Sequence, residues 1–110
     1  MATRAQQREQ SAADALAALG NRTRLRVFKL LVRAGPQGTN IGTIQRLLGV
    51  PATTLGHHLG TLAAAGLVSQ DRRGREVICT ANFKAIGEVL AYVKEECCAG
   101  VTFDEGSRAA

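Results

Sequence analysis

Residues 41–78 read Ile41-Gly-Thr-Ile-Gln-Arg-Leu-Leu-Gly-Val-Pro-Ala-Thr-Thr-Leu-Gly-His-His-Leu-Gly-Thr-Leu-Ala-Ala-Ala-Gly-Leu-Val-Ser-Gln-Asp-Arg-Arg-Gly-Arg-Glu-Val-Ile78, and this stretch decides the fold. A short helix ends at Gly49, and Pro51 opens the next one, as glycine and proline commonly do. Two short strands, 67–72 and 76–80, follow, and Gly74 between them supplies the positive φ of a tight hairpin. The order helix, turn, helix, hairpin predicts a mainly α chain with a small β-hairpin, arranged as a winged helix-turn-helix.

Helical apolar spacing also appears on both sides of that stretch. Ser11 and Asn21 are good N-cap residues for two earlier helices, and Asn82 caps a last helix that runs into Cys97-Cys98. The predicted core positions of these helices are Ala12, Leu16, Leu19, Leu25, Phe28, Leu31, Val32, Ile86, Val89, Leu90 and Val93. The domain is expected to span 11–100, with a flexible N-terminus at 1–10 and a flexible tail at 101–110.

The charge is concentrated in one part of the chain. The 110 residues suit one domain and carry a net charge of +5. Residues 1–75 hold 11 Lys/Arg against 3 Asp/Glu, whereas residues 76–110 hold 3 against 6. The excess positive charge therefore accompanies the helix-turn-helix, which indicates a polyanionic partner such as DNA.

Several classes of protein are disfavoured by composition. No apolar run approaches the roughly 20 residues of a membrane span, and the polar N-terminus lacks a signal-peptide core, so we expect no membrane and a cytoplasmic location. Three Cys without a secretory signal argue against a disulfide framework. A small thiol oxidoreductase would need a Cys-x-x-Cys motif, which is absent, and no nucleophile or acid–base constellation emerges. We therefore expect a non-enzyme that needs no cofactor to bind DNA.

The helix after Pro51 is the predicted DNA-reading helix. On a wheel that advances about 100° per residue, Leu55, Leu59 and Leu62 form one face. His58 falls beside them, so its side chain is expected to be a buried core histidine rather than a metal ligand. The opposite face and its flank carry the polar candidates for base or phosphate contacts, namely Thr53, Thr54, His57 and Thr61. The competing interpretation is an ordinary solvated polar face.

The hairpin tip carries the second set of DNA-binding candidates. Arg72, Arg73 and Arg75 surround Gly74 and suit the minor groove or nearby phosphates. Contacts of this kind provide affinity and salt dependence rather than sequence specificity. The alternative is a charged turn without a partner.

Two segments resemble the ArsR family of bacterial repressors. They are Ala18-Leu-Gly-Asn-Arg-Thr-Arg-Leu-Arg-Val27 and Leu55-Gly-His-His-Leu-Gly-Thr-Leu-Ala-Ala-Ala-Gly-Leu-Val68, and the likeness covers about residues 14–100. The resemblance implies a homodimer built on the first and last helices, bound to double-stranded operator DNA of twofold symmetry and released by an inducer. Gly56 and Gly60 depart from the family pattern, which often has Ser and a basic residue there.

The expected inducer site is Cys97-Cys98, in Glu95-Glu-Cys-Cys-Ala-Gly100. This segment is similar to the C-terminal vicinal-cysteine segment of an arsenic-responsive subgroup of the family. Trivalent arsenic is thiophilic, and soft centres select thiolate ligands. The subgroup members that bind arsenite usually have a third Cys nearby, which residues 101–110 lack, so an organoarsenical such as methylarsenite is the preferred inducer over arsenite.

Two questions about this site stay open. Cys79 is a third-ligand candidate only from the partner subunit, and its competing interpretation is a small buried strand residue. Cys97-Cys98 also suits a thiol redox or persulfide switch, or a sensor of another soft metal such as Hg(II), Cd(II) or Sb(III).

Overall fold

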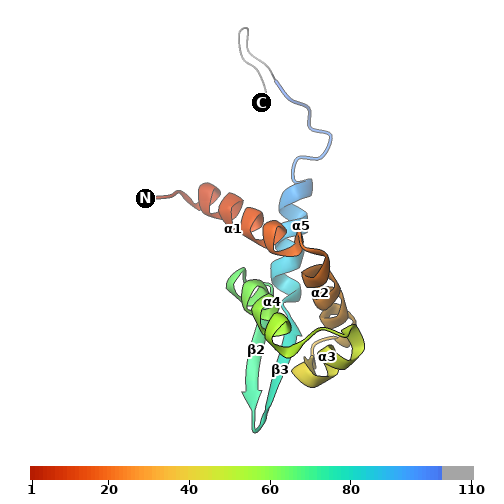
Figure 1. Cartoon of the computed structure of the whole chain (residues 1–110). Helices are drawn as coiled ribbons and strands as arrows, with labels where there is room; N and C mark the ends of the chain where they lie inside the picture. The colour runs from red at the N-terminus through yellow and green to blue at the C-terminus, as the bar shows by residue number, and fades with distance from the viewer. Residues whose placement is uncertain (103–110) are drawn as a thin grey trace.

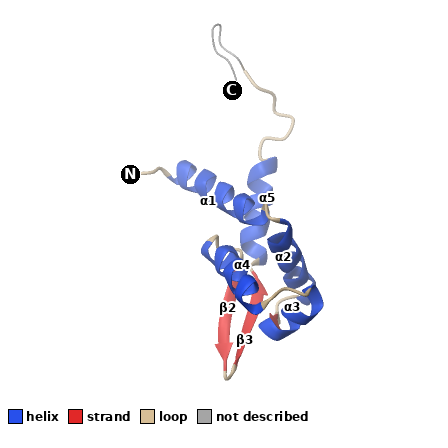
Figure 2. Cartoon of the chain, viewed as in Figure 1, coloured by secondary structure: helices blue, strands red, loops and turns tan. Residues whose placement is uncertain are grey.

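The structure is a computed structural model that describes residues 1–102. It contains five helices and a three-stranded antiparallel sheet (Figures 1 and 2). The elements are α1 (Arg4–Leu19), α2 (Arg22–Ala34), β1 (Thr39–Asn40), α3 (Ile41–Leu48), α4 (Ala52–Ala64), β2 (Val68–Arg73), β3 (Glu76–Ala81) and α5 (Phe83–Lys94). The predicted fold class, mainly α with a small hairpin in winged helix-turn-helix order, is confirmed. Among the described residues, no helix is long and apolar enough to cross a membrane.

The first helix begins earlier than the sequence analysis predicted. The Thr3 side chain accepts a hydrogen bond from the Gln6 backbone, and the Gln6 side chain accepts one from the Thr3 backbone, which makes a capping box. Helix α1 therefore begins at Arg4, and the prediction that this helix is capped by Ser11 was wrong, whereas the flexibility of residues 1–10 stays a prediction. Most of the predicted tail, 103–110, lies outside the described residues.

The core packs α4 against α2 and the sheet. Leu55, Leu59 and Leu62 have no exposed surface, as the wheel predicted, and they belong to one buried cluster with Val27 and Leu31 of α2. Burying a leucine side chain contributes about 1.5–3 kcal/mol, so this face holds the reading helix on its scaffold. The other face of α4 is consequently exposed to solvent.

The wing is a hairpin of two six-residue strands. Arg73 pairs with Glu76, so the turn contains two residues, and Gly74 has φ +64° as expected. Strand β1, which the sequence analysis did not predict, pairs with the outer edge of β3. Gly38 permits this pairing: its φ is +67°, and a Cβ there would collide with the Cys79 carbonyl oxygen.

Helices α1 and α5 lie across one another (Figure 1), and large apolar side chains on both helices are exposed in the described part of the chain. Leu16 was expected in the core, yet its side chain is 44% exposed, and the buried positions of α1 are alanines instead. Leu90 and Val93 of α5 are 56% and 58% exposed. Short alanine side chains let α1 approach the core closely, which turns the larger side chains outward.

Candidate nucleic-acid interface and cysteine pair

The outer face of α4 presents the side chains that the wheel assigned to DNA. Thr53, Thr54 and His57 are exposed. Thr61 is half-buried, and its hydroxyl donates to the His57 carbonyl oxygen at 3.1 Å, so its proton is used within the helix. The first three residues therefore have polar groups free for a ligand, whereas Thr61 is a weaker candidate.

The glycines of α4 are not required by packing. A Cβ added at Gly56 or Gly60 would meet nothing within 4 Å. Each glycine lowers helix stability by roughly 1 kcal/mol relative to alanine. Their effect is to leave the exposed side of α4 without bulky side chains at these two positions, so the helix backbone there is open to close approach.

A buried contact links the reading helix to the corner between α1 and α2. His58 is only 9% exposed, and its Nδ1 lies 3.4 Å from an Arg24 guanidinium nitrogen. Arg24 Nε also donates to the Ala18 carbonyl oxygen at 2.7 Å. Burial first, and the Arg24 charge second, lower the pKa of His58. Arg24 therefore has a positioning role that the sequence analysis did not identify; the inward direction of His58 on the wheel was the only signal.

The wing carries its three arginines exposed, as predicted. Arg73 Nε forms an ion pair with Asp71 Oδ2 at 3.0 Å, with both side chains about two-thirds exposed. Arg72 and Arg75 make no ion pair within the part of the chain that the structure describes. A solvent-exposed pair is worth at most about 1 kcal/mol, so Arg73 can still exchange Asp71 for a phosphate.

The two C-terminal cysteines lie beyond α5, in consecutive turns rather than on the helix. Cys97 N–H donates to the Lys94 carbonyl oxygen, and Ala99 N–H donates to that of Glu96. Cys98 has φ +64° and Glu96 has φ +65°, an uncommon conformation for residues with a side chain. The Cys97 and Cys98 Sγ atoms lie 3.4 Å apart, and both side chains are exposed. The turns thus bring both thiols to one point on the surface.

An ion pair and a cation–π contact, both made by Arg8 and together called the Arg8 clasp, join this segment to α1. Arg8 forms an ion pair with Glu95 at 2.8 Å, and its guanidinium carbon lies 5.1 Å from the centre of the Tyr92 ring. The hydrogen bond and charge of Arg8 lower the pKa of Glu95. Because Glu95 is the C-cap of α5, the clasp connects α1 to the residue two positions before Cys97.

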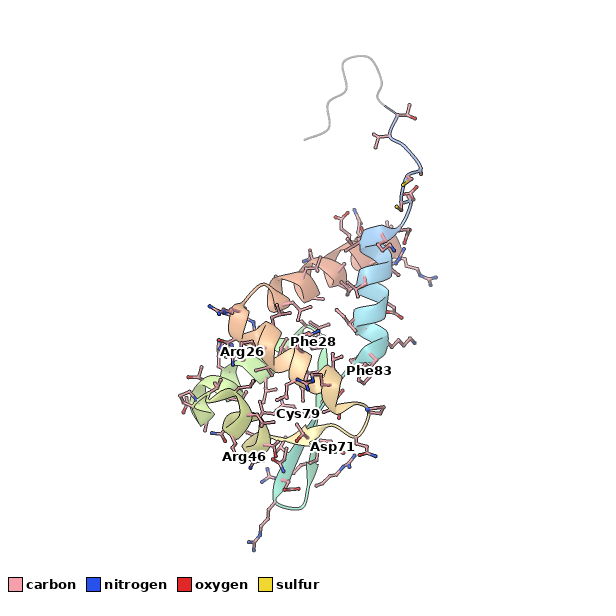
Figure 3. The ribbon with its side chains drawn as sticks, turned by 90° about the vertical axis from the view of Figure 1, so that its right-hand side faces the viewer. Arg26, Phe28, Arg46, Asp71, Cys79 and Phe83 are labelled. Carbon is pink, nitrogen blue, oxygen red and sulfur yellow. The ribbon has the colours of Figure 1, made fainter. Side chains whose placement is uncertain are left out.

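Cys79 does not join the cysteine pair. Its side chain lies in β3 with no exposed surface, and Figure 3 shows it in the interior below Phe28. Burial raises the pKa of its thiol, which opposes the thiolate form that metal binding needs. Its position fits the small buried strand residue and argues against a third ligand. Among the described residues, no three His, Cys, Asp or Glu side chains gather as a metal site.

Comparison with known proteins finds matches over this fold. Residues 19–71, from the end of α1 into β2, match a helix-turn-helix domain family. The HTH-type transcriptional regulator YgaV of Escherichia coli (strain K12) is 26% identical over 89 residues, which cover 81% of this chain and 88% of YgaV.

Two solved structures show the same architecture. An ArsR-like transcriptional regulator from Rhodococcus sp. RHA1 superposes with a TM-score of 0.70 and 26% identity, covering 83% of this chain and 82% of its own. HlyU from Vibrio cholerae N16961 superposes with a TM-score of 0.64 and 21% identity, covering 82% of this chain and 95% of its own. The match to HlyU supports the fold alone.

Proposed function

We propose that this chain, a winged helix-turn-helix transcriptional regulator of the ArsR type, is a homodimeric repressor that leaves its operator when trivalent arsenic binds Cys97 and Cys98. The observation that carries the inducer assignment is the pair of exposed thiols held 3.4 Å apart. The cytoplasm is the expected location, because operator DNA is there.

The proposed DNA contacts come from α4 and the wing. The exposed Thr53, Thr54 and His57 would enter the major groove, where their polar groups can meet base edges or phosphates. Arg72, Arg73 and Arg75 would contact phosphates or the minor groove beside it. Each phosphate contact gives a slope of about −0.9 in a plot of log K against log salt concentration, so binding should weaken strongly with salt.

The proposed dimer is supported by exposed apolar side chains of α1 and α5, which together we call the α1–α5 face. Leu16, Leu90 and Val93 lie on that face at 44–58% exposure. In a dimer with a twofold axis, each protomer would bury these three side chains in the interface, and their burial stabilises association by the hydrophobic effect. A dimer also presents two α4 helices to two half-sites, which is how small helix-turn-helix proteins reach operator specificity.

The inducer chemistry follows from two adjacent thiols. A methylarsenite carries one As–C bond and two As–OH groups. Each thiol displaces one hydroxyl, so two As–S bonds form, two waters leave, and arsenic stays trivalent. Two sulfurs and one methyl fill the three positions, so no third protein ligand is needed, in agreement with the burial of Cys79.

Inducer binding must weaken DNA binding through a difference in affinity between two states. The bound arsenic would reorganise residues 95–98, whose backbone already holds two left-handed residues. Glu95 carries that change to Arg8, and therefore to α1 of the dimer face. The predicted result is a change in the spacing of the two reading helices.

An operator-release titration tests the proposal. Reduced protein on its promoter DNA is followed by fluorescence anisotropy while methylarsenite, arsenite or Cd(II) is added. Methylarsenite should release the DNA at the lowest concentration, and Cys97→Ser and Cys98→Ser should keep DNA binding and lose release. Cys79→Ala is the matched control and should still respond. Intact DNA binding with no release by any of the three would refute the metalloid assignment.

A second candidate function is a thiol redox or persulfide switch, favoured by the same exposure and proximity of Cys97 and Cys98. Adding peroxide or polysulfide to the same assay distinguishes it. Release by these oxidants, with no response to arsenic, would make the redox switch the better assignment.

A further inference from the structure

Helices α2 and α3 enclose a groove that neither the DNA interface nor the α1–α5 face uses. Two adjoining hollows, of about 530 and 340 Å³, share Leu30, Arg33 and Leu48 as their common wall. One hollow reaches Leu47 of α3, and the other reaches Leu25 of α2. We call the two together the α2–α3 groove. Helices α2 and α3, which line it, lie away from the N-terminal end of α1 (Figure 1).

The groove has an apolar floor that is open to solvent. Leu25 is 45% exposed and Leu47 is 58% exposed. Neither residue belongs to the buried core, although Leu30 and Leu48 beside them pack against it. Leucine side chains in a concave surface favour an apolar occupant, because its burial removes water from both partners.

The α2 side of the groove rim is basic. Arg26, Lys29 and Arg33 are exposed at the i, i+3 and i+7 positions of α2, so they line one side of that helix. Neither of the two ion pairs in the described chain involves them. The sequence holds no Asp or Glu between Asp14 and Asp71, so no carboxylate of α2, α3 or α4 offsets this charge. Figure 3 views the molecule from this side, with Arg26 on α2.

Apolar floor and basic rim together define the chemistry of the occupant. DNA offers phosphates to the rim but no apolar stripe for Leu25 and Leu47. A helix with apolar residues at i, i+4 and i+7 and carboxylates along its flank satisfies both. The floor extends from Leu25 to Ala34, about 14 Å at 1.5 Å per residue, which suits two to three turns of a partner helix.

We propose that the α2–α3 groove is a docking site for an acidic amphipathic helix of another protein. Because α4 and the wing lie elsewhere, a regulator bound to its operator would still offer this groove. The regulator would then recruit a partner to the promoter, in addition to occupying DNA.

The test uses a synthetic probe, since the partner is defined by its chemistry alone. The probe is a fluorescein-labelled, hydrocarbon-stapled 16-residue peptide (about four turns) with leucines on one stripe and glutamates on both flanks. Its matched control carries lysines in place of the glutamates. Binding is followed by anisotropy, and amide chemical-shift changes in the ¹⁵N-labelled full chain locate the site.

The acidic peptide should bind, the lysine peptide should not, and the shift changes should centre on α2 and α3. Leu47→Asp and Arg33→Glu should each weaken binding about tenfold, whereas Lys84→Glu, an equal charge change on α5, should leave it unchanged. Both altered groove residues are exposed, so the variants should keep the wild-type spectrum and promoter affinity.

Three outcomes overturn the proposal. Equal binding of the lysine peptide, or none of the acidic peptide, would show that the rim selects no acidic partner. Displacement of the peptide by promoter DNA would assign the groove to the DNA interface. Shift changes centred on α1 and α5 would place the peptide on the dimer face instead.

Discussion

Replacing Arg24 by leucine separates a positioning role from a DNA contact. The substitution removes the charged donor from the Ala18 carbonyl oxygen, 2.7 Å from Arg24 Nε, and the neighbour of His58 Nδ1 at 3.4 Å. A hydrogen bond from a charged donor is worth about 1.5–3 kcal/mol, and partial exposure of Arg24 reduces this to about 1–2 kcal/mol. For a domain of this size, that loss corresponds to a decrease in Tm of about 4–15 °C.

The assay measures two quantities on the same protein. The free energy of unfolding comes from urea titration at fixed protein concentration, because a dimer's stability depends on concentration. The number of phosphate contacts comes from the slope of log K against log salt concentration. For Arg24→Leu we expect a lower urea midpoint and an unchanged salt slope. Arg72→Ala, the matched wing control, should keep the midpoint and make the slope shallower by about 0.9 per protomer.

The opposite pattern would refute the reasoning. A shallower salt slope for Arg24→Leu with an unchanged urea midpoint would mean that Arg24 contacts phosphate and that its bond to Ala18 contributes nothing to stability. An unchanged slope for Arg72→Ala would remove the wing from the DNA interface.

Four further predictions concern stability and assembly. Since the pKa of His58 is lowered on folding, the unfolded chain binds the extra proton, so stability is complete above about pH 6.5 and decreases as pH falls toward the folded-state pKa. His58→Gln should flatten that part of the pH–stability curve, and an identical curve for both proteins would contradict the burial argument. Gly38→Ala should destabilise by about 1–3 kcal/mol in urea, because φ is +67° and the methyl meets the Cys79 carbonyl oxygen; a neutral effect would mean that β1 can move away. Thr3→Ala should remove the capping box and cost about 1 kcal/mol, seen as faster amide exchange in the first turn of α1 but not of α5. Leu90→Lys should shift the sedimentation coefficient from dimer to monomer, whereas Lys84→Glu should not; a persistent dimer would place the interface elsewhere.

The local signals in the sequence were reliable where the structure depends on neighbouring residues. Asn21 and Asn82 cap α2 and α5, and Gly49 ends α3 in the left-handed conformation, all by bonds within a few residues. The spacing of Leu55 and its partners located both the buried and the exposed side of α4. Periodicity succeeds there because each face of α4 meets a uniform environment, core on one side and solvent on the other.

Apart from the start of α1, where the local capping box of Thr3 and Gln6 was missed, the failures come from contacts between distant residues. Strand β1 exists because Asn40 and Thr39 pair with β3, nearly forty residues later, and two residues carry no periodic signal. Helix α5 ends at Lys94, before the cysteines, although its apolar spacing gave no such boundary. Leu16 is exposed because alanines occupy the close contact of α1 with the core. In each case the partner lies in another element.

The sequence by itself determined the architecture of this protein: helices, caps, the hairpin and the amphipathic helix α4 follow from side-chain periodicity and turn residues, which act over a few positions. Only the tertiary structure decided which of its polar groups are free to act. In the folded chain, Arg24 contacts the Ala18 carbonyl oxygen and His58, and Cys79 is buried. Cys97 and Cys98 stay exposed, with their sulfur atoms in contact. The reason is physical: accessibility and pairing depend on what the rest of the chain brings to each side chain.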